Sequence, residues 1–191
     1  MISRASRGSN IILGGFMGTG KTSVGKRLAE RLAYEFVDLD DLIQADAGLP
    51  IGQIFATRGE GAFRAMEREM VTRMSARQRC VIATGGGAIV EPRNLEALQD
   101  IGVVIALTAT PEVILSRVGR GEDRPMLRGQ DTQQRIVQLL ADRTPAYAKA
   151  DVLVDTSARS VEEVVEHILA LLAEVPAAAQ EQMRRQCRPC V

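Results

Sequence analysis

A glycine-rich segment from Gly15 to Thr22, with the sequence GFMGTGKT, carries the most specific chemical signal in the chain. It fits the pattern G-x-x-x-x-G-K-[ST], in which backbone N–H groups surround a phosphate chain, a lysine adds positive charge and a hydroxyl can bind Mg²⁺. An apolar run at residues 11–13 precedes it, and Val24 and Leu28 lie at helical spacing after it. This context predicts a nucleoside triphosphate site with Mg²⁺, whereas the alternative is a glycine-rich turn that happens to contain a lysine.

Two carboxylates follow the next short apolar run, at residues 36–37. Alternation in an extended segment would put Asp38 and Asp40 on the same side, so that both could face the phosphates. We expect Asp38 to hold Mg²⁺ through water and Asp40 to accept a hydrogen bond from an attacking hydroxyl. The alternative is that these acids cap a helix beginning near Leu42, a role that we assign to Asp41.

Two further segments contain residues suited to binding an anionic acceptor. Arg64 has Glu60 and Glu67 at helical spacing on either side, which would fix it as a bidentate clamp, although a surface ion-pair ladder has the same pattern. Arg143, in the segment RTPAY, is a second candidate clamp. The glycines at 85–87 follow an apolar run and would expose backbone donors to a neighbouring ligand.

The segment 117–129 (RVGRGEDRPMLRG) is polar and contains three glycines that could act as hinges. A solvated loop is the default interpretation of such a charged run. In a phosphotransferase the same composition suits a lid that excludes water and brings an arginine to the transferring phosphoryl group. The arginines of this segment are Arg117, Arg120, Arg124 and Arg128.

These residues need elements that position them, and the chain alternates short apolar runs with amphipathic stretches. Continuous apolar runs are typical of parallel strands covered on both faces. Pro92 and Pro111 each lie where a helix should begin, and a last helical stripe extends from Val161 to Leu172. Strands that alternate with helices predict an open parallel sheet with ligands at the carboxyl ends of its strands. The expected strands lie at 11–13, 36–37, 80–83, 103–107 and 152–154.

Composition excludes several other classes of protein. With 191 residues, 46% of them hydrophobic, the chain has the size and balance of one globular domain. The 24 basic and 24 acidic residues cancel, and 3% aromatic residues offer few surfaces for stacking bases, which argues against a nucleic-acid partner. No apolar run reaches the roughly 18 to 20 residues of a membrane span, so no membrane partner is expected. Three cysteines are too few for a disulfide framework and favour the cytoplasm.

Taken together, the motifs make the chain resemble a shikimate kinase. The matching segments run in order from about residue 10 to residue 173: GFMGTGKT, FVDLD, IFATRGEGAFRAME, TGGG, DRPML and RTPAY. The resemblance implies a P-loop NTPase-type three-layer α/β fold, nucleoside monophosphate kinase-like with a lid. Its sheet would be a five-stranded parallel sheet of order 2-3-1-4-5 with helices on both faces. The activity implied is ATP-dependent phosphorylation of the 3-hydroxyl of shikimate in aromatic amino-acid (chorismate) biosynthesis.

The same resemblance assigns roles to individual residues. Lys21, Asp40 and Arg124 would be catalytic, with Thr22 and Asp38, the latter through water, holding Mg²⁺. ATP, the co-substrate, would contact Gly15, Gly18, Thr19, Gly20, Lys21, Thr22, Ser23, Arg117, Arg124 and Arg159. Shikimate would contact Asp40, Phe55, Phe63, Arg64, Glu67, Gly85, Gly86, Gly87 and Arg143.

The expected organisation is a loose N-terminus over residues 1–10, a single kinase domain over 11–175 and a flexible tail over 176–191. The shikimate-binding region would span about 38–67 and the lid about 117–129. We expect a cytoplasmic monomer. Two rival functions remain at this point: another small-molecule or nucleoside monophosphate kinase, and a nucleotide-sensing switch without catalysis.

Overall fold

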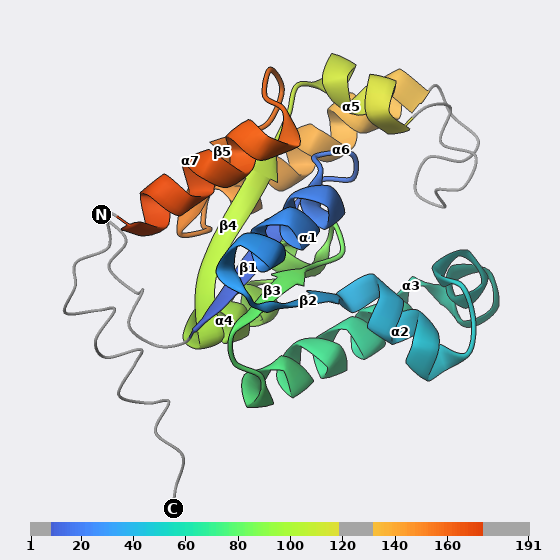
Figure 1. Ribbon diagram of the computed structural model, residues 1–191. Coiled ribbons are helices and arrows are strands. Elements are labelled where there is room, and N and C mark those ends of the chain that lie inside the picture. The colour runs from blue at the N-terminus through green and yellow to red at the C-terminus, as the bar shows by residue number, and fades with distance from the viewer. Residues whose placement is uncertain (1–8, 119–131, 174–191) are drawn as a thin grey trace, which may run out of the picture.

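A single sheet of five parallel strands organises the computed structural model, which describes residues 9–118 and 132–173. The strand order is β2-β3-β1-β4-β5, which confirms the order that the resemblance implied (Figure 1). β1 and β3 are buried along their whole length, and β4 is buried except at its last residue, as expected for strands covered on both faces. The strands are β1 (Asn10–Gly15), β2 (Glu35–Asp38), β3 (Cys80–Ala83), β4 (Gly102–Thr108) and β5 (Val152–Asp155).

Helices cover both faces of this sheet and complete the three layers. α1 and α7 lie side by side on one face, where Leu13 of β1 packs with Val24 and Val165 (Figure 1). The neighbouring Ile12 points to the opposite face and packs there with residues of α2 to α6. The helices are α1 (Lys21–Leu32), α2 (Leu39–Ala47), α3 (Ile51–Arg73), α4 (Pro92–Ile101), α5 (Pro111–Val118), α6 (Thr132–Tyr147) and α7 (Val161–Ala173), with short 3₁₀ turns η1 (Met74–Ala76) and η2 (Ala88–Val90).

All five expected strands are present, with ends within two residues of the predicted ones, and two starting points need a physical explanation. α4 and α5 begin at Pro92 and Pro111, as predicted. The first strand begins at Asn10, which we had placed in the loose N-terminus. Its buried side chain donates to the Arg77 carbonyl (2.8 Å) and accepts from the Cys80 backbone N–H (3.0 Å), so a polar residue is satisfied inside the sheet.

The prediction that a helix begins near Leu42 with Asp41 as its cap was wrong. α2 begins at Leu39, directly after β2, and Asp38 is the N-cap, since its side chain accepts from the Asp40 backbone N–H (3.1 Å). Leu39 and Ile43 are both buried at a spacing of one helical turn. The helix therefore begins at Leu39, three residues before the predicted start at Leu42, because this places Leu39 and Ile43 together in the core.

None of the helices in the described part of the chain combines the length and the apolar character needed to cross a bilayer.

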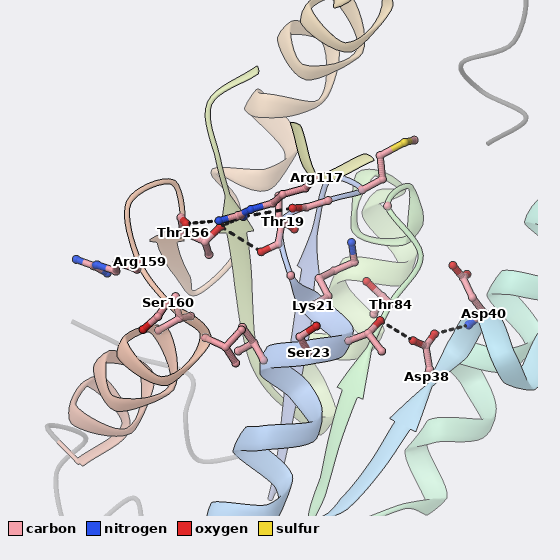
Figure 2. A pocket seen from close by; sticks show the side chains of 18 residues that line it. Thr19, Lys21, Ser23, Asp38, Asp40, Thr84, Arg117, Thr156, Arg159 and Ser160 are labelled. Atoms are coloured by element: carbon pink, nitrogen blue, oxygen red, sulfur yellow. Dashed lines mark hydrogen bonds between the residues drawn. The ribbon is translucent and has the colours of Figure 1, made fainter. Parts of the chain in front are cut away.

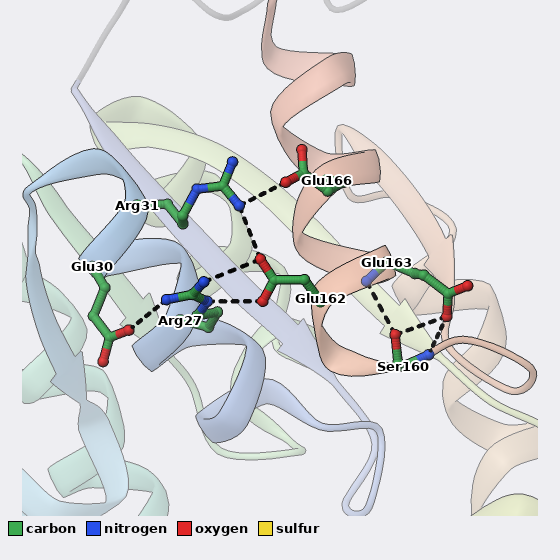
Figure 3. Close-up of polar contacts among 7 residues, drawn as sticks. All are labelled: Arg27, Glu30, Arg31, Ser160, Glu162, Glu163 and Glu166. Atoms are coloured by element: carbon green, nitrogen blue, oxygen red, sulfur yellow. Dashed lines mark hydrogen bonds and ion pairs between the residues drawn. The ribbon is translucent and has the colours of Figure 1, made fainter.

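An exposed network of charges joins α1 to the N-terminal part of α7 (Figure 3). Arg27 contacts Glu162 at 2.8 Å, and Arg31 contacts both Glu162 (2.9 Å) and Glu166 (2.6 Å). The hydrogen bond from Arg27 is the main cause that lowers the pKa of the Glu162 carboxyl. Because these groups are exposed, solvent and salt weaken the network, and it orients the two helices more than it stabilises the fold.

We predict that Glu162→Gln lowers the melting temperature by only about 1 to 3 °C at low salt, and by less at 1 M NaCl. The effect should also fade as the pH falls through the lowered pKa of Glu162, because protonation removes the same charge. Differential scanning fluorimetry at several salt concentrations measures it. Glu96→Gln, at an exposed position of α4, is the matched control, and equal, salt-independent shifts in both variants would contradict the prediction.

Candidate active site

The loop between β1 and α1 has the backbone geometry of a phosphate cradle. Gly15 has a φ of +123°, and a Cβ atom there would overlap the Leu107 carbonyl of the adjacent strand β4. α1 then begins at Lys21 with Gly20 in the left-handed conformation and no side-chain cap. The first backbone N–H groups of α1 are therefore not capped by a side chain, and the positive end of the helix dipole favours an anion there.

Hydrogen bonds within the loop hold its shape. The Lys21 ammonium donates to the carbonyls of Gly15 (2.9 Å) and Phe16 (2.8 Å), which keeps the charge at the centre of the loop. The fully buried Thr19 donates its hydroxyl to the Phe16 carbonyl as well (2.8 Å). The cradle is therefore organised by its own residues before any ligand arrives.

Thr22 and Asp38 bring a hydroxyl and a carboxylate together beside this cradle. Figure 2 shows Asp38 next to Asp40, at the end of β2. The Thr22 hydroxyl donates to Asp38 Oδ2 at 3.1 Å, while Asp38 Oδ1 accepts from the Asp40 N–H. Hard oxygen ligands of this kind fit Mg²⁺, which commonly binds one or two protein groups together with substrate phosphates. The donor set thus suits the metal that the sequence predicted.

A cavity of about 520 Å³ surrounds the cradle and extends to the start of α7. Its lining includes the predicted residues Arg117 and Arg159, and Figure 2 shows the Arg159 side chain directed away from Lys21. Several other residues of the lining had no predicted role, because Met17 is at a variable position of the glycine-rich motif and the others lie outside it. These are Met17, Thr84, Thr156, Ser160, Val161 and Val164.

A second cavity, of about 780 Å³, lies against α2, α3 and the glycines of residues 85–87. It contains all the side chains and glycines that were predicted to bind the acceptor. Further polar groups, Asp41, Gln44 and Gln53, also line it and were missed. The two cavities share a boundary formed by Met17, Thr22, Asp38, Asp40 and Gly86.

Asp38 and Asp40 both reach this boundary, but not by the alternation that we expected. Asp38 ends β2, and Asp40 lies in the first turn of α2. The reasoning from an extended segment was therefore wrong, because the chain turns into a helix between them. The helix nevertheless carries Asp40 onto the wall that both cavities share.

Arg64 is held between two carboxylates, as predicted. Its guanidinium donates to Glu67 at 2.9 Å and to Glu60 at 3.2 Å, and a Cβ on Gly87 would lie 2.5 Å from its Nη1 atom. Burial raises the pKa of the Glu67 carboxyl, and Arg64 offsets only part of that effect. Burial also opposes the charge on Arg64, but Glu67 and Glu60 outweigh it and raise the pKa of the guanidinium.

The second predicted clamp, Arg143, comes from α6 and lies beside the phosphate cradle. Its guanidinium carbon is 5.6 Å from the centre of the Phe16 ring, and its Nη1 donates to the Gly86 carbonyl at 3.3 Å. The same carbonyl accepts a hydrogen bond from the buried Tyr147 hydroxyl (2.7 Å). Gly86 thus lies between the cradle and Arg143, since a Cβ there would be 3.6 Å from both Arg143 Nη1 and the Met17 nitrogen.

Phe55 and Phe63 form an apolar wall of the second cavity. Their ring centres are 4.8 Å apart, although they lie in different halves of α3. The helix is kinked at Gly59, whose φ of 79° and ψ of 169° are not helical. The kink lets the two halves of α3 place their rings against each other on one side of the cavity.

The expected lid is described only at its first two residues. Arg117 and Val118 end α5, whereas Arg120, Arg124 and Arg128 lie outside the described residues. The roles assigned to Arg124 and to the segment 119–129 therefore remain predictions from the sequence.

Comparisons with known proteins give a consistent result. The family model described as shikimate kinase matches residues 17–173. A shikimate kinase from Geobacter metallireducens is 46% identical over 90% of this chain and 96% of its own length, and one from Symbiobacterium thermophilum is 48% identical over 86% and 97%. The solved shikimate kinase from Acinetobacter baumannii, in complex with shikimate, has a TM-score of 0.84 at 35% identity, covering 92% of this chain and all of that one.

The geometry at Gly15 generates a prediction about stability. Gly15→Ala should reduce the free energy of unfolding by at least about 3 kcal/mol, because the new methyl group meets the β4 backbone at a positive φ. Urea unfolding followed by circular dichroism measures the loss. Gly61→Ala is the control, because its Cβ meets nothing within 4 Å in a helix, so it should be neutral or gain about 0.5 to 1 kcal/mol. Equal stabilities of the two variants would contradict the assignment.

Proposed function

The chain belongs to the shikimate kinase family, and we propose that its two joined cavities hold ATP and shikimate side by side for the ATP-dependent phosphorylation of shikimate. The observation that carries this proposal is the shared boundary between the cavities. The phosphate cradle lies on one side of that boundary, and Arg64 and Arg143 lie on the other. A ring alcohol bound by the arginines would therefore face the terminal phosphate of ATP.

On the nucleotide side, the cradle and α1 bind the phosphates. The backbone N–H groups of the first turn of α1 point to the phosphate chain, and Lys21 compensates the charge that develops on the oxygens during transfer. Thr22 and Asp38 would hold Mg²⁺, which supplies further positive charge to the phosphates. The groups that would balance the charge of the phosphates on this side therefore lie within the loop, the start of α1 and the end of β2.

On the acceptor side, the arginines fix the substrate carboxylate. Arg64 is oriented by Glu67 and Glu60, and Arg143 by the Gly86 carbonyl, so both guanidinium groups are positioned before binding. The rings of Phe55 and Phe63 pack against the apolar part of the acceptor. Shikimate, a small cyclic monoacid, has the charge and shape for this cavity.

Asp40 orients the 3-hydroxyl for attack in line with the γ-phosphoryl group. It lies on the wall shared by the two cavities, where the attacking oxygen has to be. In a loose transition state alignment contributes more than basicity, so Asp40 accepts the hydroxyl hydrogen bond and takes the proton late. The products are shikimate 3-phosphate and ADP.

Three further parts of the proposal rest on the sequence. Arg124 is the lid arginine that approaches the transferring phosphoryl group. The protein is a monomer, which sedimentation velocity tests, and it acts in the cytoplasm, which fractionation of the source cells tests.

The decisive experiment is an ADP-release assay with ATP, MgCl₂ and shikimate. We expect turnover that depends on shikimate and stops when Mg²⁺ is chelated with EDTA. AMP, CMP and gluconate, which represent the rival kinase classes, should give no turnover above background. Turnover with any of these in place of shikimate would overturn the assignment of the acceptor, and absence of turnover with every acceptor would favour a nucleotide-sensing switch.

Arg64→Lys tests the proposed clamp. The variant keeps the positive charge but loses the planar fork, so the KM for shikimate should rise roughly 10- to 100-fold while the KM for ATP changes less than about twofold. Arg68→Lys, one turn further along α3 and exposed, makes the same substitution outside the cavity and should behave as the wild type. An unchanged KM for shikimate in Arg64→Lys would show that Arg64 does not bind the acceptor.

A further inference from the structure

Thr156, the residue directly after β5, joins four segments of the chain through one buried side chain. It is 2% exposed, and its hydroxyl oxygen lies 3.1 Å from the Thr19 carbonyl of the phosphate cradle. The hydroxyl also lies 3.1 Å from the carbonyl of Thr108, at the end of β4. Arg117, on α5, completes the group by donating from Nη1 to the Thr156 hydroxyl (3.0 Å) and from Nη2 to its carbonyl (2.8 Å) (Figure 2).

The hydrogen-bond capacity of these groups indicates which contact the hydroxyl serves. A threonine hydroxyl has one hydrogen to donate, so it can serve only one of the two carbonyls at a time. The Thr108 carbonyl already accepts from the Thr156 backbone N–H at 2.9 Å. Donation by the hydroxyl to the Thr19 carbonyl therefore adds a link to the cradle, whereas the Thr108 carbonyl has the backbone N–H as a donor in either case, and a lone pair of the hydroxyl accepts from Arg117.

Arg117 is oriented by oxygen atoms without formal charge. Besides the two groups of Thr156, it donates to the carbonyl of Gly18 in the cradle (3.3 Å). Carbonyl and hydroxyl acceptors fix the plane of the guanidinium without neutralising it in an ion pair. Arg117 lines the nucleotide cavity, so its charge stays directed to a nucleotide.

We propose that Thr156 is a positioning residue for the nucleotide, because its hydroxyl fixes the phosphate cradle and Arg117 relative to each other. Thr156 lines the nucleotide cavity and takes no part in the wall of the acceptor cavity, so its effect is confined to ATP and ADP. This inference rests on the proposed function, in that the cavity around the cradle is the one that binds ATP.

Thr156→Val tests the inference, because it removes the hydroxyl and keeps the shape of the side chain. We expect the KM for ATP, and the Kd for ADP with MgCl₂ measured by isothermal titration calorimetry, to rise about five- to twentyfold. The KM for shikimate should change less than about twofold, since the acceptor cavity is untouched. Thr156→Ser keeps the hydroxyl and should restore the values for ATP and ADP to within about threefold of the wild type.

Thr108→Val is the matched control. It leaves the Thr108 backbone carbonyl, which belongs to the same network, in place and removes only the hydroxyl, which donates to the Val154 carbonyl (3.4 Å). Thr108 lines neither cavity. Its ADP affinity should equal that of the wild type. Where Thr156→Val does not fold, Thr156→Ala removes the same hydroxyl without placing a methyl group against the carbonyl oxygens, and the same rise in the ADP Kd is expected.

Three results would overturn the inference. The first is wild-type ADP affinity in the folded Val or Ala variant, and the second is an equal rise in the KM values for ATP and shikimate. The third is failure of Thr156→Ser to restore ADP binding. Failure of the proposed function is distinguishable, because it would appear in the wild-type protein as absence of shikimate-dependent ADP release, whereas calorimetry with ADP still reports on Thr156.

Discussion

The absence of side chains at residues 85–87 is the constraint on which the rest of the site depends. β3 places this segment beside β1, where a Cβ on Gly86 would be 3.6 Å from backbone atoms of the phosphate cradle, and where its carbonyl accepts from Arg143 and Tyr147. At the next position, Gly87, only a glycine leaves room for the Arg64 guanidinium, because a Cβ would lie 2.5 Å from its Nη1 atom. Because residues 85–87 have no side chains, Arg64, Arg143 and the cradle can lie close to one another. No side chain from this segment blocks the boundary between the two cavities, across which the phosphoryl group would be transferred.

The charges around this segment explain the kind of acceptor that fits. Arg64 and Arg143 contribute two positive charges, and the buried Glu67 contributes one negative charge, although burial raises its pKa. Glu60 is more than half exposed, so solvent screens its charge. The carboxylates of Asp38, Asp40 and Asp41 also line this cavity, and among the described residues of its lining the two guanidinium groups are the only cationic side chains. This composition suits the single negative charge of a monoacid better than a dianionic phosphate, which the carboxylates would repel.

The elements that could be foreseen from sequence are those whose signal is local. Central strands such as β3 and β4 show as continuous apolar runs, and the cradle shows as a motif between a strand and a helix. The start of α2 was misjudged because the burial of Leu39 and Ile43 depends on α3, which a local pattern of acids does not reveal. Thr156 was missed because its hydroxyl meets a residue 137 positions away in the chain, and no spacing rule connects them.

The position of α2 and α3 between β2 and β3 has an evolutionary consequence. β2 is an edge strand, so the segment of α2 and α3 follows a strand at the edge of the sheet. The phosphate cradle, in contrast, follows the central strand β1. Mutations in α2 and α3 can change the shape of the acceptor cavity without altering the strand that leads into the phosphate cradle. A new acceptor specificity can therefore evolve through changes in this one segment, while the nucleotide-binding site stays the same.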